Sequence, residues 1–156
     1  MLKKILPWFV FASLFILIIV GYRLKDNMDA HLSTMIKNQA PALDKAWAQV
    51  VVDSLYNYSE NELNYQITFL EFGAKGCSAC KRMETVMEEI KHKYPDEVNV
   101  IFRNVLIEDN LRLMKYYGIA SIPTQVILDD TGKEFFRHSG YISTADLNEA
   151  FQDKLK

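Results

Sequence analysis

Cysteine is scarce in this 156-residue chain, which has only two, and this excludes a small domain stapled by several disulfides. The chain also lacks an excess of charge of one sign. Its formal net charge of −2 gives no electrostatic reason to expect nucleic acid as a partner. It has no internal repeat and no low-complexity segment. Its hydrophobic content of 49% and charged content of 24% are ordinary for a globular chain, and its length suits one domain with attachments.

Charge is absent from one long run near the amino terminus, Ile5 to Tyr22. Eighteen helical residues span roughly 27 Å, about the thickness of the hydrocarbon core of a bilayer. We therefore predict an uncleaved membrane anchor, a transmembrane helix, over residues 1–22. A cleaved signal peptide and a buried core helix are the alternatives, although no small-x-small cleavage pattern follows the run.

The short tail before the run favours one orientation of this anchor. Lys3 and Lys4 precede the run, whereas Arg23 and Lys25 follow it, so the basic residues alone do not decide the orientation. A tail of four residues makes retention of the amino end in the cytoplasm the natural outcome. The rest of the chain then lies on the extracytoplasmic, periplasmic side of the cytoplasmic membrane, where a dithiol must be kept reduced actively.

The remainder divides into a polar connection and one domain. Residues 23–41 are predicted to form a stalk or linker, and residues 42–156 are predicted to form the domain. Hydrophobic periodicity and turn residues predict alternating elements within it. They are a helix at 42–56, a strand at 67–72, a helix from Cys77, a strand within 98–107, a helix at 109–117, a hairpin at 124–130 and 133–140, and a closing helix, with a polar connection at 57–66. This order predicts an α/β fold, a mixed central sheet flanked by helices on both faces.

The two cysteines lie in "FLEFGAKGCSACKRMETVMEEI" (69–90), where Cys77 and Cys80 are separated by two residues. A structural disulfide, half of a metal site and a redox-active dithiol all fit this spacing. Structural zinc needs about four ligands, and His92 lies roughly 18 Å along the predicted helix from Cys80. A c-type haem would need histidine where Lys81 stands. We therefore expect no metal and no cofactor.

The dithiol interpretation has a physical basis. Cys77 is predicted at the start of a helix, where unpaired backbone N–H groups and the helix dipole favour the thiolate that attacks disulfides. Cys80 lies one turn further on, and it can attack a mixed disulfide at Cys77 and release the partner. An inert pair in a loop is the alternative.

Three motifs in register carry a resemblance to a known family: "FLEFGAKGCSAC" before a helix, "YYGIASIPTQVIL" about forty residues later, and "GKEFFRHSGYIS" before a closing helix. Over roughly residues 42–156 the chain resembles the thioredoxin superfamily. The resemblance implies a cis Ile122–Pro123 bond beside the dithiol and a substrate edge that includes Gly140. It also implies that Glu71 is a buried carboxylate that transfers protons. A trans proline and a glutamate facing solvent are the alternatives at these positions.

The resemblance also has departures. Thioredoxins commonly have tryptophan before the first cysteine and Gly-Pro between the two, whereas this chain has Gly76 and Ser78-Ala79. With its predicted anchor, the chain looks more like the tethered reductases that serve cytochrome c maturation or other extracytoplasmic thiols. It is also similar to the carboxy-terminal domain of transmembrane thiol-disulfide interchange proteins.

The predicted function is that of a membrane-anchored thiol-disulfide oxidoreductase that reduces extracytoplasmic proteins, with Cys77 attacking and Cys80 resolving. Protein disulfides, a membrane electron donor and the lipid bilayer are the expected partners. A disulfide oxidase or isomerase is one alternative. A non-enzymatic binding or assembly module with a structural disulfide is the other.

Overall fold

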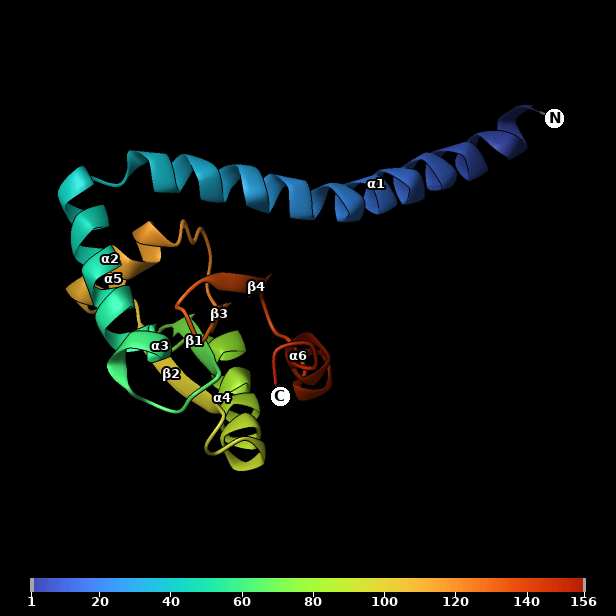
Figure 1. Ribbon diagram of the computed structural model, residues 1–156. Coiled ribbons are helices and arrows are strands. Elements are labelled where there is room, and N and C mark those ends of the chain that lie inside the picture. The colour runs from blue at the N-terminus through green and yellow to red at the C-terminus, as the bar shows by residue number, and fades with distance from the viewer. Residues whose placement is uncertain (1, 156) are drawn as a thin grey trace.

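The structure is a computed structural model that describes residues 2–155, apart from the side chains of residues 2–7, 9, 10, 12 and 22–27. Its elements follow the chain in the order shown in Figure 1: α1 (Leu2–Gln39), α2 (Ala42–Tyr56), α3 (Tyr58–Asn61), β1 (Ile67–Gly73), α4 (Ser78–Lys93), β2 (Val98–Asn104), α5 (Glu108–Tyr116), β3 (Thr124–Asp129), β4 (Glu134–Ser139) and α6 (Thr144–Phe151). From Ala42 onward, the helices and strands predicted from periodicity are present within a few residues of their expected bounds.

The strands form one mixed sheet in the order β2-β1-β3-β4. Strand β1 is parallel to β2 and antiparallel to β3, which is in turn antiparallel to β4. The apolar strand that precedes the cysteines is thus a central strand. The prediction of a mixed central sheet is confirmed.

Two hydrophobic cores lie on opposite faces of the sheet, because successive side chains of β1 point to opposite sides. Phe69 belongs to the core built with Met83 of α4 and Leu147 of α6. Phe72 belongs to the core on the other face, which includes residues of α2 and α5. The predicted helical cover on both faces is therefore confirmed, and α4 lies on the same face as Phe69.

The connection expected over residues 57–66 contains a short helix, α3, that the sequence analysis missed. Backbone N–H groups of Tyr58 and Ser59 donate to the carbonyl of Asp130, which ties this segment to the β3–β4 turn. The buried hydroxyl of Tyr58 is hydrogen-bonded to Thr68 of β1 at 2.6 Å. The helix forms because distant partners satisfy its polar groups, and such partners leave no local pattern.

Helix α1 leaves the domain as a long arm in Figure 1, and it is helical through most of the segment expected to be a stalk. Its last turns contact the domain. Arg137 of β4 donates to the Ser33 hydroxyl at 3.2 Å, and the Ser33 hydroxyl donates to the carbonyl of Tyr117 at 3.5 Å.

Among the helices of the described residues, none is long and apolar enough to cross a membrane. Much of the anchor predicted over residues 1–22 falls outside the described part of the structure, because the side chains at 1–7, 9, 10, 12 and 22 are not described.

Candidate active site

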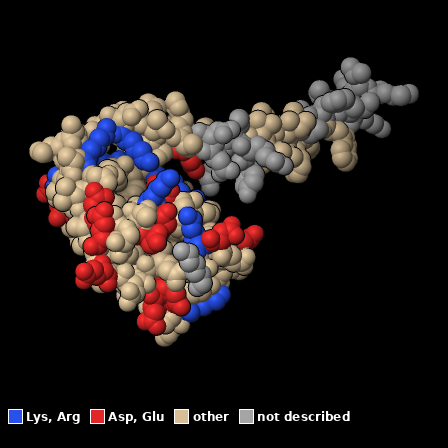
Figure 2. Space-filling view, in the orientation of Figure 1, with Lys and Arg blue, Asp and Glu red and all other residues tan. Residues whose placement is uncertain are grey.

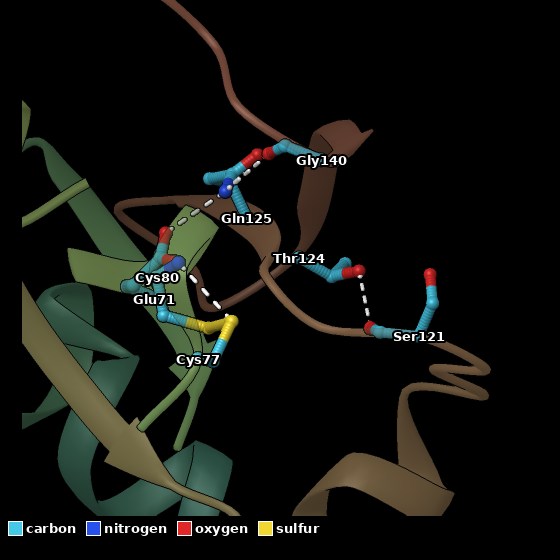
Figure 3. Close-up of a disulfide and its surroundings, with 7 residues drawn as sticks. All are labelled: Glu71, Cys77, Cys80, Ser121, Thr124, Gln125 and Gly140. Atoms are coloured by element: carbon cyan, nitrogen blue, oxygen red, sulfur yellow. Dashed lines mark hydrogen bonds between the residues drawn. A yellow bond between two sulfur atoms is a disulfide. The ribbon is translucent and has the colours of Figure 1, made fainter. Parts of the chain in front are cut away.

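A disulfide joins Cys77 and Cys80 at the start of α4, with their Cα atoms 5.2 Å apart (Figure 3). Cys77 is the N-cap of the helix, and its sulfur accepts a hydrogen bond from the Cys80 backbone N–H at 3.2 Å. Helix α4 thus begins where the sequence placed it, with a cysteine sulfur against unpaired N–H groups. The two sulfurs differ in access, because Cys77 is half-buried while Cys80 is only 3% exposed.

Gly73 at the end of β1 allows the strand to approach the disulfide closely. A Cβ atom on Gly73 would lie 3.3 Å from both the Cβ and the sulfur of Cys80, and 2.9 Å from a ring carbon of Phe102. The carbonyl of Gly73 accepts a hydrogen bond from Val105 at 2.9 Å, which fixes the strand end. A larger residue at this position would push Cys80 or Phe102 away.

Glu71 lies on the α4 face of β1, because alternate residues of a strand share a face and Phe69 packs against α4. It is therefore one strand repeat, about 7 Å, from the point where Gly73 meets Cys80. The side chain is fully buried rather than facing solvent. Burial raises the pKa of this carboxyl from its usual 4.5 to about 8, although a hydrogen bond from Gln125 opposes the rise.

The register of the sheet aligns four residues in one row across the sheet. Glu71 pairs with Phe102 of β2 on one side and with Gln125 of β3 on the other, and Gln125 pairs with His138 of β4. The Gln125 amide nitrogen donates to Glu71 Oε2 at 3.0 Å and to the Gly140 carbonyl at 3.1 Å (Figure 3).

The loop before β3 contains the cis Ile122–Pro123 bond that the family resemblance implied. The backbone N–H of Gly140 donates to the Pro123 carbonyl at 2.8 Å, so Gly140 and Pro123 lie together. The Thr124 hydroxyl closes the loop by donating to the Ser121 carbonyl at 2.8 Å. Figure 3 draws Ser121, Thr124 and Gly140 among the surroundings of the disulfide, from β3 and the loops that flank the β3–β4 hairpin.

The structure thus gathers the predicted Cys77, Cys80 and Glu71 at one end of the sheet. Gln125 was not predicted as a site residue from the sequence. The only sequence signal for it is a polar residue within the apolar run "TQVIL". In the part of the chain that the structure describes, no group of three or more histidine, cysteine or acidic side chains could hold a metal ion.

Comparison with known proteins identifies the family. The sequence profile described as "Thioredoxin-like domain" matches residues 57–155. The chain belongs to this thioredoxin-like family. It is therefore a thiol-disulfide oxidoreductase, and Cys77 and Cys80 are the cysteine pair of its CxxC motif.

Two relatives and one solved structure illustrate the similarity. The chain is 31% identical over 100 residues to a thioredoxin of Buchnera aphidicola, covering 64% of this chain and 90% of the relative. It is 30% identical over 107 residues to a thioredoxin of Griffithsia pacifica, covering 68% and 94%. A mutant thioredoxin from Halobacterium salinarum superposes with a TM-score of 0.53 at 21% identity, covering 61% of this chain and 80% of the other, and so shares the fold.

Proposed function

We propose that this thioredoxin-like protein is a membrane-anchored reductase of protein disulfides outside the cytoplasmic membrane. The observation that carries the proposal is Glu71, a buried carboxylate on the face of β1 that meets Cys80.

Reduction proceeds through two exchanges of sulfur. The Cys77 thiolate attacks one sulfur of the substrate disulfide, the S–S bond breaks, and the other substrate sulfur leaves as a thiolate. Glu71 accepts the proton of Cys80, directly or through one water, and the Cys80 thiolate attacks the Cys77 sulfur. The Cys77–Cys80 disulfide forms and the second substrate sulfur leaves. Two electrons pass from the dithiol to the substrate. A dithiol donor, which we propose is a membrane partner, must later restore them.

Glu71 suits this proton transfer because its pKa is close to that of a thiol. A free cysteine has a pKa of about 8.5, and burial raises the pKa of Glu71 to about 8. Transfer between groups of matched pKa has a small energetic cost, and efficient general bases have a pKa near the working pH. Glu71 Oε1 has no hydrogen-bond partner among the described residues, so this oxygen is available for the proton.

The same carboxylate favours reduction over oxidation as the direction of catalysis. Strongly oxidising members of this chemistry stabilise the reduced pair through an exceptionally acidic first cysteine. In its ionised form, the nearby Glu71 carboxyl opposes further stabilisation of a thiolate at Cys77, because like charges repel in a low-dielectric site. We therefore expect a reduction potential in the range of a reductant.

The proposed substrate edge consists of Ile122, Pro123 and Gly140. Pro123 and Gly140 are joined through their backbones, and an extended substrate segment could add backbone hydrogen bonds along this edge. The proposed substrates include the disulfide of apocytochrome c, which must be reduced to two thiols before haem attachment. A thiol:disulfide interchange protein TxlA homolog of Synechocystis is 36% identical over 69 residues, covering 44% of this chain and 38% of that protein, and its name describes related chemistry.

The anchor proposal rests on the apolar run and on how α1 projects. Large apolar side chains in the described part of α1, such as Phe11, Leu14 and Ile18, are exposed. Figure 2 shows the lysine, arginine and acidic side chains distributed over the domain, while the tan segment of the arm between its grey segments shows no charged side chain. A bilayer would cover this apolar surface, which water would otherwise contact.

Full-length protein is expected to stay in the membrane fraction after high-salt and alkaline washes, because the attachment is apolar rather than ionic. Replacing Leu14 and Ile18 together with arginine should release it, since each charge near the centre of a membrane helix costs about 2.5–3.5 kcal/mol. The matched control replaces Leu32 and Met35, which are exposed on the same helix beyond the run, and should remain bound. Release of the unmodified protein by the washes would contradict the anchor.

The proposed orientation has a separate test. An alkaline phosphatase fused to the carboxyl terminus should be active, since that enzyme needs an oxidising compartment.

A further inference from the structure

The Gln125 side chain is a fully buried amide whose orientation is fixed by its partners. Its nitrogen lies 3.0 Å from Glu71 Oε2 and 3.1 Å from the Gly140 carbonyl oxygen. A backbone carbonyl can only accept a hydrogen bond, so the nitrogen rather than the oxygen of the amide must face Gly140. The two N–H hydrogens of the amide are then both used, one on the carboxylate and one on the loop.

This amide connects the candidate proton acceptor with the proposed substrate edge. Glu71 is hydrogen-bonded to Gln125, Gln125 to the Gly140 carbonyl, and the Gly140 N–H to the Pro123 carbonyl at 2.8 Å. Figure 3 shows the first two of these contacts, from Glu71 through Gln125 to Gly140. The elements that this bridge joins are β1, β3 and the loop after β4.

We propose that Gln125 is a positioning residue for disulfide exchange: it donates to one oxygen of Glu71, leaves the other oxygen free, and ties this carboxyl group to the substrate edge. This inference rests on the proposed role of Glu71 as the proton acceptor for Cys80. The amide carries no proton that titrates near neutral pH, so it acts only through the geometry and the charge of its neighbour.

An N–H donor stabilises the carboxylate form of Glu71 more than the carboxylic acid, because only the charged oxygen accepts strongly. Removing the donor while keeping the volume therefore raises the pKa of Glu71 further. Glu71 is paired with Phe102 of β2 and Gln125 of β3, and His138 follows Gln125 in the same row. Cys80 of α4 lies against Gly73, the next residue of β1 on the same face as Glu71. Because His138 is the titratable side chain beyond the amide, a His138→Gln variant is included to remove its contribution from the comparison.

The test follows the two exchange steps separately in full-length reduced protein in mild detergent. An aromatic disulfide that releases a coloured thiolate gives one release when Cys77 attacks and a second when Cys80 resolves. We expect the resolution rate to rise with pH around a midpoint near 8. In Gln125→Met, which keeps an unbranched side chain of similar size, the midpoint should move up by about one pH unit. Resolution at pH 7 should then be about tenfold slower, with the first release little changed.

The matched control is Thr68→Val. Like Gln125→Met, it removes a buried hydrogen-bonding group, here the β1 hydroxyl that contacts Tyr58, but Thr68 lies outside the row of Glu71. It should lower stability without moving the midpoint. His138→Gln should also leave the shift caused by Gln125→Met in place. If Gln125→Met fails to fold, Gln125→Asn replaces it. The asparagine side chain keeps the amide but is one methylene shorter, so it cannot reach both Glu71 and the Gly140 carbonyl. This variant should shift the midpoint of the resolution rate in the same direction.

The outcomes separate this proposal from the role of Glu71. In a Glu71→Gln background, Gln125→Met should cause no further slowing of resolution, because the residue acts through the carboxylate. A normal midpoint in both Gln125 variants, together with a lost midpoint in Glu71→Gln, would overturn the role of Gln125 and leave that of Glu71 intact. An unchanged midpoint in Glu71→Gln would overturn the role of Glu71 and, with it, that of Gln125.

Discussion

Replacing Cys77 with serine is expected to abolish disulfide reduction, with a loss on the order of a thousandfold or more, because the attacking thiolate is removed. Cys77 is the accessible member of the pair and the N-cap of α4, whereas Cys80 is buried beneath it. Turnover of a protein disulfide such as that of insulin measures the loss.

The Cys80→Ser variant should fail in a different way. Its Cys77 still attacks, but no second thiol resolves the product, so mixed disulfides with substrates accumulate and run as larger species on non-reducing gels. Ser54→Ala, at an exposed position on α2, is the control and should behave as the unmodified protein. Activity retained by Cys77→Ser together with no trapped species in Cys80→Ser would reverse or refute these roles.

Replacing Glu71 with glutamine should change stability as well as catalysis. Burial raises the pKa of Glu71 to about 8 in the folded protein, whereas the unfolded chain has the usual value near 4.5. Between these values the folded state keeps a proton that the unfolded state has lost. The free energy of unfolding therefore falls as pH rises through this window, by about 1.4 kcal/mol per pH unit for this group.

Glu71→Gln removes this part of the pH dependence, since the amide does not titrate. The variant should thus be more stable than the unmodified protein by a few kcal/mol at pH 8, and nearly equal to it below pH 4.5. Urea unfolding of both proteins in detergent, with the cysteine pair oxidised, measures the difference. Glu84→Gln, at an exposed position on α4, is the control and should follow the unmodified protein. Parallel pH profiles for Glu71→Gln and the unmodified protein would show that the carboxyl has no raised pKa.

The catalytic effect should have the opposite sign. Without the carboxylate, Cys80 has no nearby acceptor for its proton, and resolution should slow more than the first attack. A protein that is more stable without Glu71 but exchanges disulfides more slowly would show that the buried carboxylate is retained for function at a cost to stability.

Local patterns were sufficient to predict most of the domain. The strand that contains Phe69 and Phe72 is rich in apolar and aromatic residues, and the helix that follows Cys77 has a clear apolar face, so both were predicted close to their bounds. The cis bond at Pro123 followed from family resemblance rather than from residue chemistry, because a cis proline has no local signature of its own.

The missed features depend on partners far away in sequence. The hydrogen bond between Gln125 and Glu71 joins residues that only the β1–β3 register places opposite each other. Likewise, Ser33 contacts Arg137 only after α1 has packed against the domain. The charged segment of α1 that precedes Ser33 has no apolar periodicity from which a continuous helix could be predicted. Such contacts arise from tertiary structure, and no local pattern specifies them.

The reduction potential of the Cys77–Cys80 pair is the most direct test of the proposed direction. Full-length protein would be equilibrated in glutathione and dithiothreitol buffers of graded potential, and the reduced fraction counted by thiol alkylation. We expect a value near that of thioredoxin, about −270 mV, because Glu71 opposes thiolate stabilisation at Cys77. A value near the strongly oxidising limit of about −120 mV would contradict the reductase and favour a disulfide oxidase.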